Sequence, residues 1–85
     1  MHHAYILISA KSGKTYTGST SDVEKRLKKH NSGGSRFTKG HMPWELIYAE
    51  GYSTKAEALV REKFLKSGQG RMIVKNLVKQ HSGIV

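Results

Sequence analysis

The chain has 85 residues, and its 15 lysines and arginines against 6 acidic residues give it a formal net charge of +9. This length predicts one small domain spanning residues 1–85. The absence of cysteine excludes a disulfide framework, a thiolate zinc site and a cysteine nucleophile. Because the apolar stretch 4–8 is too short for a membrane span or a secretion signal, we expect a cytoplasmic protein without a membrane segment. The positive charge favours a polyanionic partner, and nucleic acid is the commonest one.

The chain begins with the pattern of a β-hairpin. Residues 4–8 are apolar and rich in strand-forming side chains, and residues 14–19 contain the β-branched Thr15 and Thr17. Ser12-Gly13 between them is a turn signal. With an even number of residues in the connection, odd positions of the first strand share a face with even positions of the second. Tyr5 and Tyr16 are then expected on the same side of the sheet.

A first helix is predicted after this hairpin. Ser21 and Glu24 have the spacing of a capping box, so the helix should begin there. The run Asn31-Ser-Gly-Gly should end it. Residues four apart lie on one helix face, so Arg26 and His30 should be neighbours at the edge of its buried side.

The next segment, residues 31–42, is rich in Gly, Ser and charge, with only one aromatic residue to anchor it, and is predicted to be a mobile loop. Residues 44–49 alternate as in a strand. The alternation places Trp44, Leu46 and Tyr48 on one face. A third strand is therefore expected here.

Two more helices complete the prediction. Thr54 and Glu57 repeat the capping-box spacing and open a helix that runs to about Ser67. Its expected buried face consists of Ala56, Leu59, Val60 and Phe64. Apolar residues within 72–77 suggest a short last helix. The element order β-β-α-β-α-α predicts an α+β fold with a small three-stranded antiparallel sheet flanked by helices.

Several of these positions, taken together, resemble the GIY-YIG nucleases, in particular the compact bacterial single-domain members. The matching residues in chain order are Tyr5, Tyr16-Thr-Gly18, Arg26, His30 and Glu62. Ala4 and Thr17 replace a glycine and an isoleucine of the family signature, but neither position carries a reacting group. Ser19 stands where the excision-repair relatives have a lysine. The resemblance covers nearly the whole chain and implies a GIY-YIG-like fold.

The resemblance implies hydrolysis of DNA phosphodiester bonds, with DNA repair as one setting. Tyr16 would be the likelier general base and Tyr5 would position water or phosphate, although the two could exchange roles. Arg26 would stabilise the charge of the transition state, and His30 would hydrogen-bond across the site. Gly18 and Asn76 would be motif positions. The candidate phosphate-contacting residues are Lys25, Lys29, Arg36, Lys39 and Arg71.

The implied cofactor is one Mg²⁺ or Mn²⁺ ion held by Glu62. A two-metal nuclease needs several converging carboxylates, and this chain has only 6 acidic residues. A single carboxylate is enough for one metal ion when water and phosphate oxygens fill the remaining positions.

Each residue also has an ordinary structural interpretation. A strand tyrosine commonly packs in a core, and a histidine near a helix C-terminus is commonly structural. Glu62 alone would more often pair with Lys66. The alternative functions are a non-catalytic nucleic-acid-binding module and a purely structural interaction protein. The preferred nucleic acid, a possible homodimer and a partner protein that supplies specificity stay open.

Overall fold

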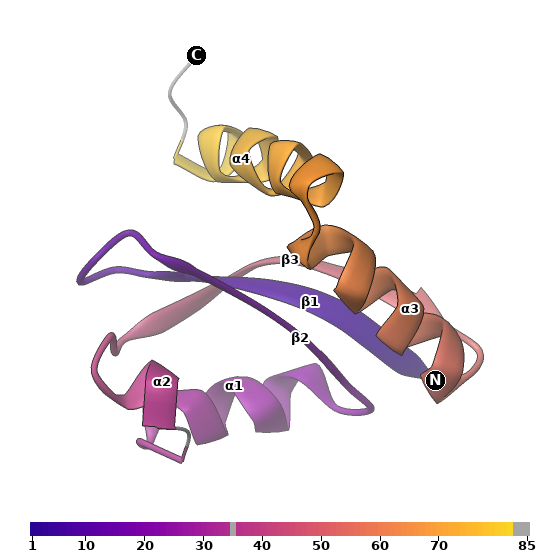
Figure 1. Cartoon of the computed structure of the whole chain (residues 1–85). Coiled ribbons are helices and arrows are strands. Elements are labelled where there is room, and N and C mark those ends of the chain that lie inside the picture. The colour runs from indigo at the N-terminus through magenta and orange to yellow at the C-terminus, as the bar shows by residue number, and fades with distance from the viewer. Residues whose placement is uncertain (35, 83–85) are drawn as a thin grey trace.

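The computed structural model describes residues 1–34 and 36–82. Its elements are β1 (His2–Ser9), β2 (Thr15–Thr20), α1 (Val23–Asn31), α2 (Arg36–Lys39), β3 (Trp44–Tyr52), α3 (Lys55–Lys66) and α4 (Gly68–Ser82). The strands form one antiparallel sheet of order β2-β1-β3. Helices α1 and α2 cover one face of this sheet, and α3 and α4 cover the other (Figure 1). The predicted α+β fold is confirmed. None of the described helices is long and apolar enough to cross a membrane.

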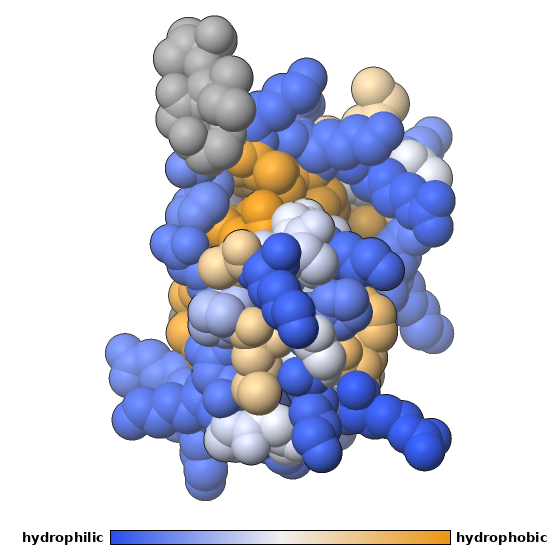
Figure 2. Space-filling model, turned by 90° about the vertical axis from the view of Figure 1, so that its left-hand side faces the viewer, coloured by the Kyte–Doolittle hydropathy of each residue, from blue (hydrophilic) through white to orange (hydrophobic). Residues whose placement is uncertain are grey.

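Strand β1 supplies two separate cores because its side chains alternate between the faces of the sheet. Tyr5 and Leu7 are buried on the side of α1, in a cluster with Trp44. Ala4 and Ile6 are buried on the side of α3 and α4. Seen from the side in Figure 2, hydrophobic surface gathers in the upper part, where α4 packs, and hydrophilic side chains project around it.

The register of the first hairpin agrees with the prediction. Leu7 pairs with Tyr16, and Tyr5 pairs with Gly18, so both tyrosines face α1. Gly13 in the turn has a φ of 75°, a conformation that favours glycine. The hairpin therefore brings two phenols to one face of the sheet.

The start of α1 differs from the prediction by one residue. Asp22, and not Ser21, is the N-cap, and its carboxylate accepts a hydrogen bond from the amide of Lys25 at 3.1 Å. A carboxylate suits this place because it also interacts favourably with the positive end of the helix dipole. Glu24 lies in the first turn of the helix.

The predicted mobile loop is wrong, because the segment is anchored at several points and contains α2. The side-chain amide of Asn31 donates to the carbonyl of Trp44 at 3.0 Å and accepts from its amide at 2.6 Å. The indole of Trp44 donates to the carbonyl of Thr38 at 2.8 Å, and Thr38 is fully buried. Within this segment, residue 35 lies outside the described residues.

Strand β3 is longer than predicted, and its alternation is interrupted. The pairing shifts between Leu7–Leu46 and Ile6–Tyr48, so Ile47 is the extra residue of a β-bulge. As a result Leu46 packs on the side of α1 and Tyr48 on the side of α3. The prediction that both share a face with Trp44 is therefore wrong for Tyr48.

Helix α3 begins as predicted but buries a different face. The hydroxyl of its N-cap Thr54 accepts from the amide of Glu57 at 3.2 Å. Ala58 and Leu65 are the buried positions. Of the predicted face, Ala56, Leu59 and Val60 are exposed, Val60 to 68%, and Phe64 is partly buried. The small Ala58 lets the helix lie close to the sheet. With this face of the helix buried, the side chain of Glu62 is partly buried as well.

The last helix is much longer than predicted and begins at Gly68. Gly70 belongs to its first turn and does not end the preceding helix. A Cβ at Gly70 would collide with backbone atoms of Phe64 and Leu65. The glycine therefore allows α4 to begin directly against the end of α3.

Candidate active site

The hydroxyl of Tyr5 forms a buried hydrogen bond with a histidine of α1. Its oxygen lies 3.0 Å from Nε2 of His30, and both residues are buried. Tyr5 points to α1 because it is at an odd position of the central strand, and His30 comes from the last turn of α1. The two residues are 25 positions apart in the sequence, so the fold alone brings them together.

Thr38 continues this hydrogen-bonded row and was not predicted from the sequence. Its hydroxyl oxygen lies 3.0 Å from Nδ1 of His30. A threonine in a polar segment gives no signal of such a role. The two nitrogens of His30 are therefore both engaged, one by Tyr5 and one by Thr38, which fixes the orientation of the ring.

The electrostatic surroundings keep this row uncharged. Burial, followed by the charges of Arg26 and Lys29, lowers the pKa of His30 below its ordinary value. Burial is also the main cause that raises the pKa of Tyr5 well above its ordinary value. Tyr16 and Glu62 raise the pKa of Tyr5 further, and Arg26 acts in the opposite direction. Tyr5 is therefore a neutral phenol at physiological pH.

Tyr16 lies beside this row with its ring more open to solvent. Its ring centroid is 4.7 Å from that of His30 and 6.3 Å from that of Tyr5. Tyr16 is also one of the residues that line a groove of about 540 Å³, together with Lys66, Arg71 and Lys75. Within the described residues the Tyr16 hydroxyl has no hydrogen-bond partner. Of the two tyrosine hydroxyls, that of Tyr16 is therefore the one available to bind a ligand.

Gly18 makes the approach of the two tyrosines possible. A Cβ at this position would lie 2.7 Å from the hydroxyl oxygen of Tyr5 and 3.0 Å from a ring carbon of Tyr16. Such distances are not tolerated between real atoms. The structure thus gives this motif glycine a packing reason: a side chain here would collide with Tyr5 and Tyr16.

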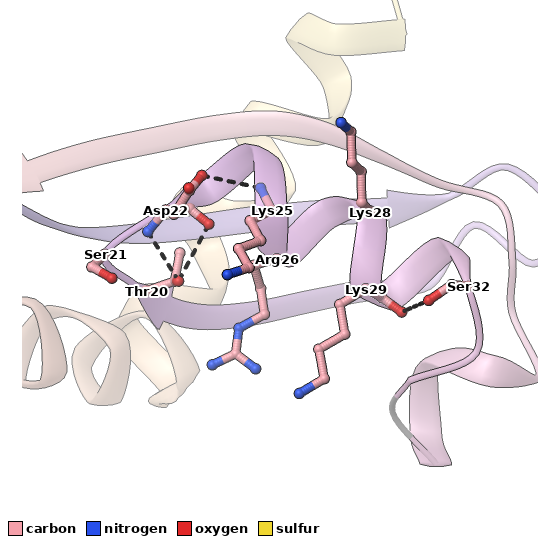
Figure 3. A pocket seen from close by; sticks show the side chains of 8 residues that line it. All are labelled: Thr20, Ser21, Asp22, Lys25, Arg26, Lys28, Lys29 and Ser32. Atoms are coloured by element: carbon pink, nitrogen blue, oxygen red, sulfur yellow. Dashed lines mark hydrogen bonds between the residues drawn. The ribbon is translucent and has the colours of Figure 1, made fainter.

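Arg26 borders a basic groove beside α1. The groove has a volume of about 590 Å³. Its lining residues are Thr20, Ser21, Asp22, Lys25, Arg26, Lys28, Lys29 and Ser32. In Figure 3 the side chains of Arg26 and Lys29 project from the same side of α1, whereas Lys28 points the other way. A smaller groove of about 210 Å³, which also contains Lys55, shares Arg26 with it.

Glu62 reaches the site from α3, and its charge acts on the Tyr5 hydroxyl. Its side chain is only 19% exposed, and its Oε2 forms an ion pair with Nζ of Lys66 at 2.7 Å. Among the described residues no group of three or more His, Cys, Asp or Glu side chains could hold a metal ion. A single carboxylate fits Mg²⁺ or Mn²⁺ if water and phosphate oxygens complete the coordination. The pairing with Lys66 is the ordinary interpretation of Glu62, and a metal ion would have to replace it.

The remaining predicted residues lie at the surface of the molecule. Arg36 and Lys39 are exposed on α2, and Asn76 is exposed on α4. Lys25 lines the groove of α1, and Arg71 lines the groove next to Tyr16. The structure brings together Tyr5, Tyr16, Gly18, Arg26, His30 and Glu62 through the contacts and charges described above. The chemical roles of all these residues stay predictions.

Comparison with known proteins identifies the family. The model of the GIY-YIG catalytic domain matches residues 1–75. A UPF0213 protein of Staphylococcus saprophyticus is 46% identical over 67 residues, which cover 78% of this chain and 80% of the relative. One from Halobacterium salinarum is 42% identical over 67 residues, covering 78% and 86%.

A solved structure agrees with this result. The solution NMR structure of the UPF0213 protein BH0048 from Bacillus halodurans has a TM-score of 0.51 and 35% identity. The match covers 91% of this chain and 85% of that one. The chain therefore belongs to the GIY-YIG nuclease family, within its compact UPF0213 group.

Proposed function

We propose that this protein is a metal-dependent endonuclease that hydrolyses DNA phosphodiester bonds with one Mg²⁺ or Mn²⁺ ion. The observation that supports it best is the hydrogen-bonded row from Tyr5 through His30 to Thr38, with Tyr16 beside it and the charges of Arg26 and Glu62 acting on Tyr5. A row of buried polar side chains costs stability unless every member is paired. An apolar core of this size would not need such complete pairing. The presence of the polar row therefore supports a catalytic role for it.

The surroundings of the two tyrosines suggest different roles. Tyr5 is held as a neutral phenol, so it is suited to orient a water molecule or a phosphate and not to accept a proton. Tyr16, whose oxygen is open, is the proposed general base: acting as the phenolate, it would accept the proton that the attacking water loses. The water oxygen then bonds to phosphorus, and the bond from phosphorus to the leaving oxygen breaks.

Arg26 is proposed to stabilise the charge that develops on the non-bridging oxygens. A guanidinium offers two parallel donors that match a phosphate, and such a donor strengthens its interaction in the transition state. A metal ion bound by Glu62 would supply further charge stabilisation for the leaving oxygen.

DNA is the proposed substrate because two grooves with basic linings involve residues of the candidate site: Arg26 lines one, and Tyr16 lines the other. One is lined by Lys25, Arg26 and Lys29, and the other contains Arg71 and Lys75. With a net charge of +9, binding should weaken steeply with salt as counterions are released. Salt dependence alone does not separate catalysis from binding.

The test is a time course on supercoiled, branched and single-stranded DNA with and without Mg²⁺. Glu62→Ala should abolish cleavage and leave DNA binding nearly unchanged. Glu45→Ala is the matched control, because Glu45 is an exposed carboxylate on β3. Metal-independent cleavage, or cleavage by Glu62→Ala at the wild-type rate, would remove the metal assignment.

A second candidate is a non-catalytic module that binds nucleic acid. The observation in its favour is the ion pair of Glu62 with Lys66, which occupies the carboxylate proposed to hold the metal ion. This candidate predicts DNA binding without nicking under any metal condition.

A further inference from the structure

Phe37 is an exposed aromatic ring next to the tyrosine proposed as general base. It is 47% exposed, and the other exposed large hydrophobic residues of the described part are Met1, Leu59, Val60 and Met72. It is thus the aromatic one of this set. Its ring centroid lies 6.2 Å from that of Tyr16, with the planes inclined by 28°, so the two rings are stacked.

Two further aromatic rings lie next to the exposed ring of Phe37. The rings of His41 and Trp44 lie 5.2 Å and 6.2 Å from it. Trp44 is itself buried and bonded to the carbonyl of Thr38, the residue next to Phe37 in α2. These neighbouring rings restrict the side chain of Phe37. The restriction reduces the conformational entropy that is lost when a flat ligand covers the ring.

The charge around Phe37 favours an anionic ligand. Arg36 and Lys39, the two ends of α2, are both exposed, and α2 has no acidic residue. Open aromatic rings flanked by basic side chains are the combination that binds single-stranded nucleic acid, because bases stack on the rings and phosphates meet the cations.

We propose that Phe37 is a nucleobase-stacking subsite that receives an unpaired base adjacent to the scissile phosphate. This inference rests on the proposed function, which places that phosphate at Tyr16 and Arg26. A base is joined to its phosphate through one sugar, so it can reach a ring that is stacked on Tyr16. A paired base inside a duplex has both faces covered, and it must leave the stack to use this subsite.

Binding to a base-free strand separates stacking from charge. A thymidine oligonucleotide and a sugar-phosphate oligonucleotide of equal length with no bases carry the same phosphates. Trp44 is the single tryptophan of the chain, and its ring is 6.2 Å from Phe37, so its fluorescence reports on this surface. The titrations use the wild-type chain in the presence of a chelator, which prevents metal-dependent cleavage.

We expect the wild-type chain to bind the thymidine strand about tenfold more tightly than the base-free strand, with a change in tryptophan fluorescence. Phe37→Leu should lose this difference, and Phe37→Tyr should keep it. Equal affinity of the wild-type chain for the two strands would overturn the subsite. So would Phe37→Leu weakening both strands alike, since a structural role predicts that result.

If Phe37→Leu fails to fold, the wild-type comparison of the two strands and the Phe37→Tyr variant still decide. The outcome is independent of catalysis. Base-dependent binding in these titrations, together with no cleavage of DNA when Mg²⁺ is supplied in the separate time course, would support the subsite and overturn the proposed nuclease. Equal affinities for the two strands, together with metal-dependent cleavage of both at equal rates, would support the nuclease and overturn the subsite.

Discussion

The hydroxyl of Tyr5 occupies the space that a side chain at position 18 would need. A Cβ on Gly18 would lie 2.7 Å from this oxygen. The hydrogen bond between Tyr5 and His30 therefore depends on the absence of a side chain on the neighbouring strand.

Gly18→Ala should move Tyr5 and reduce both stability and cleavage. Overpacking of this kind costs about 1–3 kcal/mol, and the displaced hydroxyl can no longer reach His30. Thermal unfolding and the nicking rate measure the two effects. Gly40→Ala is the control, because a Cβ there meets no atom within 4 Å. A Gly18→Ala protein with unchanged stability would show that the tyrosines adjust freely.

Removing one hydroxyl at a time should separate the roles of the two tyrosines. Tyr5→Phe leaves a buried nitrogen of His30 without its partner, which should cost about 1–3 kcal/mol of unfolding free energy. Tyr16→Phe should change stability by no more than about 0.5 kcal/mol, yet reduce the cleavage rate by about 10²-fold or more as a lost general base. Denaturant titrations and single-turnover kinetics test the pair. Full activity of Tyr16→Phe would exclude it as the base.

The stability of the fold should decrease below about pH 6.5, the ordinary pKa of a histidine. Burial, with Arg26 and Lys29, lowers the pKa of His30 in the folded state. The contribution of His30 is therefore fully present above the ordinary value. As the pH falls below it, the unfolded chain binds a proton that the folded chain does not, and the unfolding free energy decreases. Denaturant titrations at several pH values should show a smaller decrease of the unfolding free energy for His30→Gln than for the wild-type chain. An identical decrease would show that His30 is not the cause of this pH dependence.

Arg26→Ala should lower the cleavage rate by about 10²-fold, because it removes the guanidinium that is proposed to stabilise the charge of the transition state. Lys28→Ala removes a charge from the same helix but from a side chain that points away from Arg26 and Lys29 (Figure 3), so it should keep the wild-type rate. Rates at saturating DNA measure the difference. Similar losses in both variants would mean that only overall charge matters.

Lys66→Met should strengthen metal binding. The ammonium of Lys66 pairs with Oε2 of Glu62 at 2.7 Å, and a metal ion must displace it. Loss of the interaction free energy of such a partly exposed ion pair corresponds to a gain of about two- to fivefold in Mn²⁺ affinity. Calorimetry measures it, with the exposed Lys63→Met on the same helix as control. Unchanged affinity would indicate that the metal ion does not use this carboxylate.

Local patterns predicted the parts of the site that depend on periodicity. The period of two placed Tyr5 and Tyr16 on one face, and the helical spacing placed Arg26 beside His30. Pairing between distant segments was beyond such patterns. The contact of Thr38 with His30 depends on how the segment after α1 folds back, and nothing in the sequence marks it.

The other differences have the same physical origin. A bulge at Ile47 reversed the expected face of Tyr48, because alternation assumes unbroken pairing. Helix α3 packs through Ala58 since a small residue permits close approach, although larger apolar residues lie on its outer side. Tertiary packing, and not the pattern of the helix alone, chose this face.

The amide of Asn31 gives the first residue of β3 the two hydrogen bonds that a neighbouring strand would provide. Trp44 thus has no free main-chain group there with which to recruit an extended segment of a second molecule. Since β3 is an outer strand of the sheet, one side chain closes a point at which chains could otherwise join edge to edge. The residue that follows the histidine of the candidate site in the sequence therefore also satisfies the main chain at the start of this outer strand.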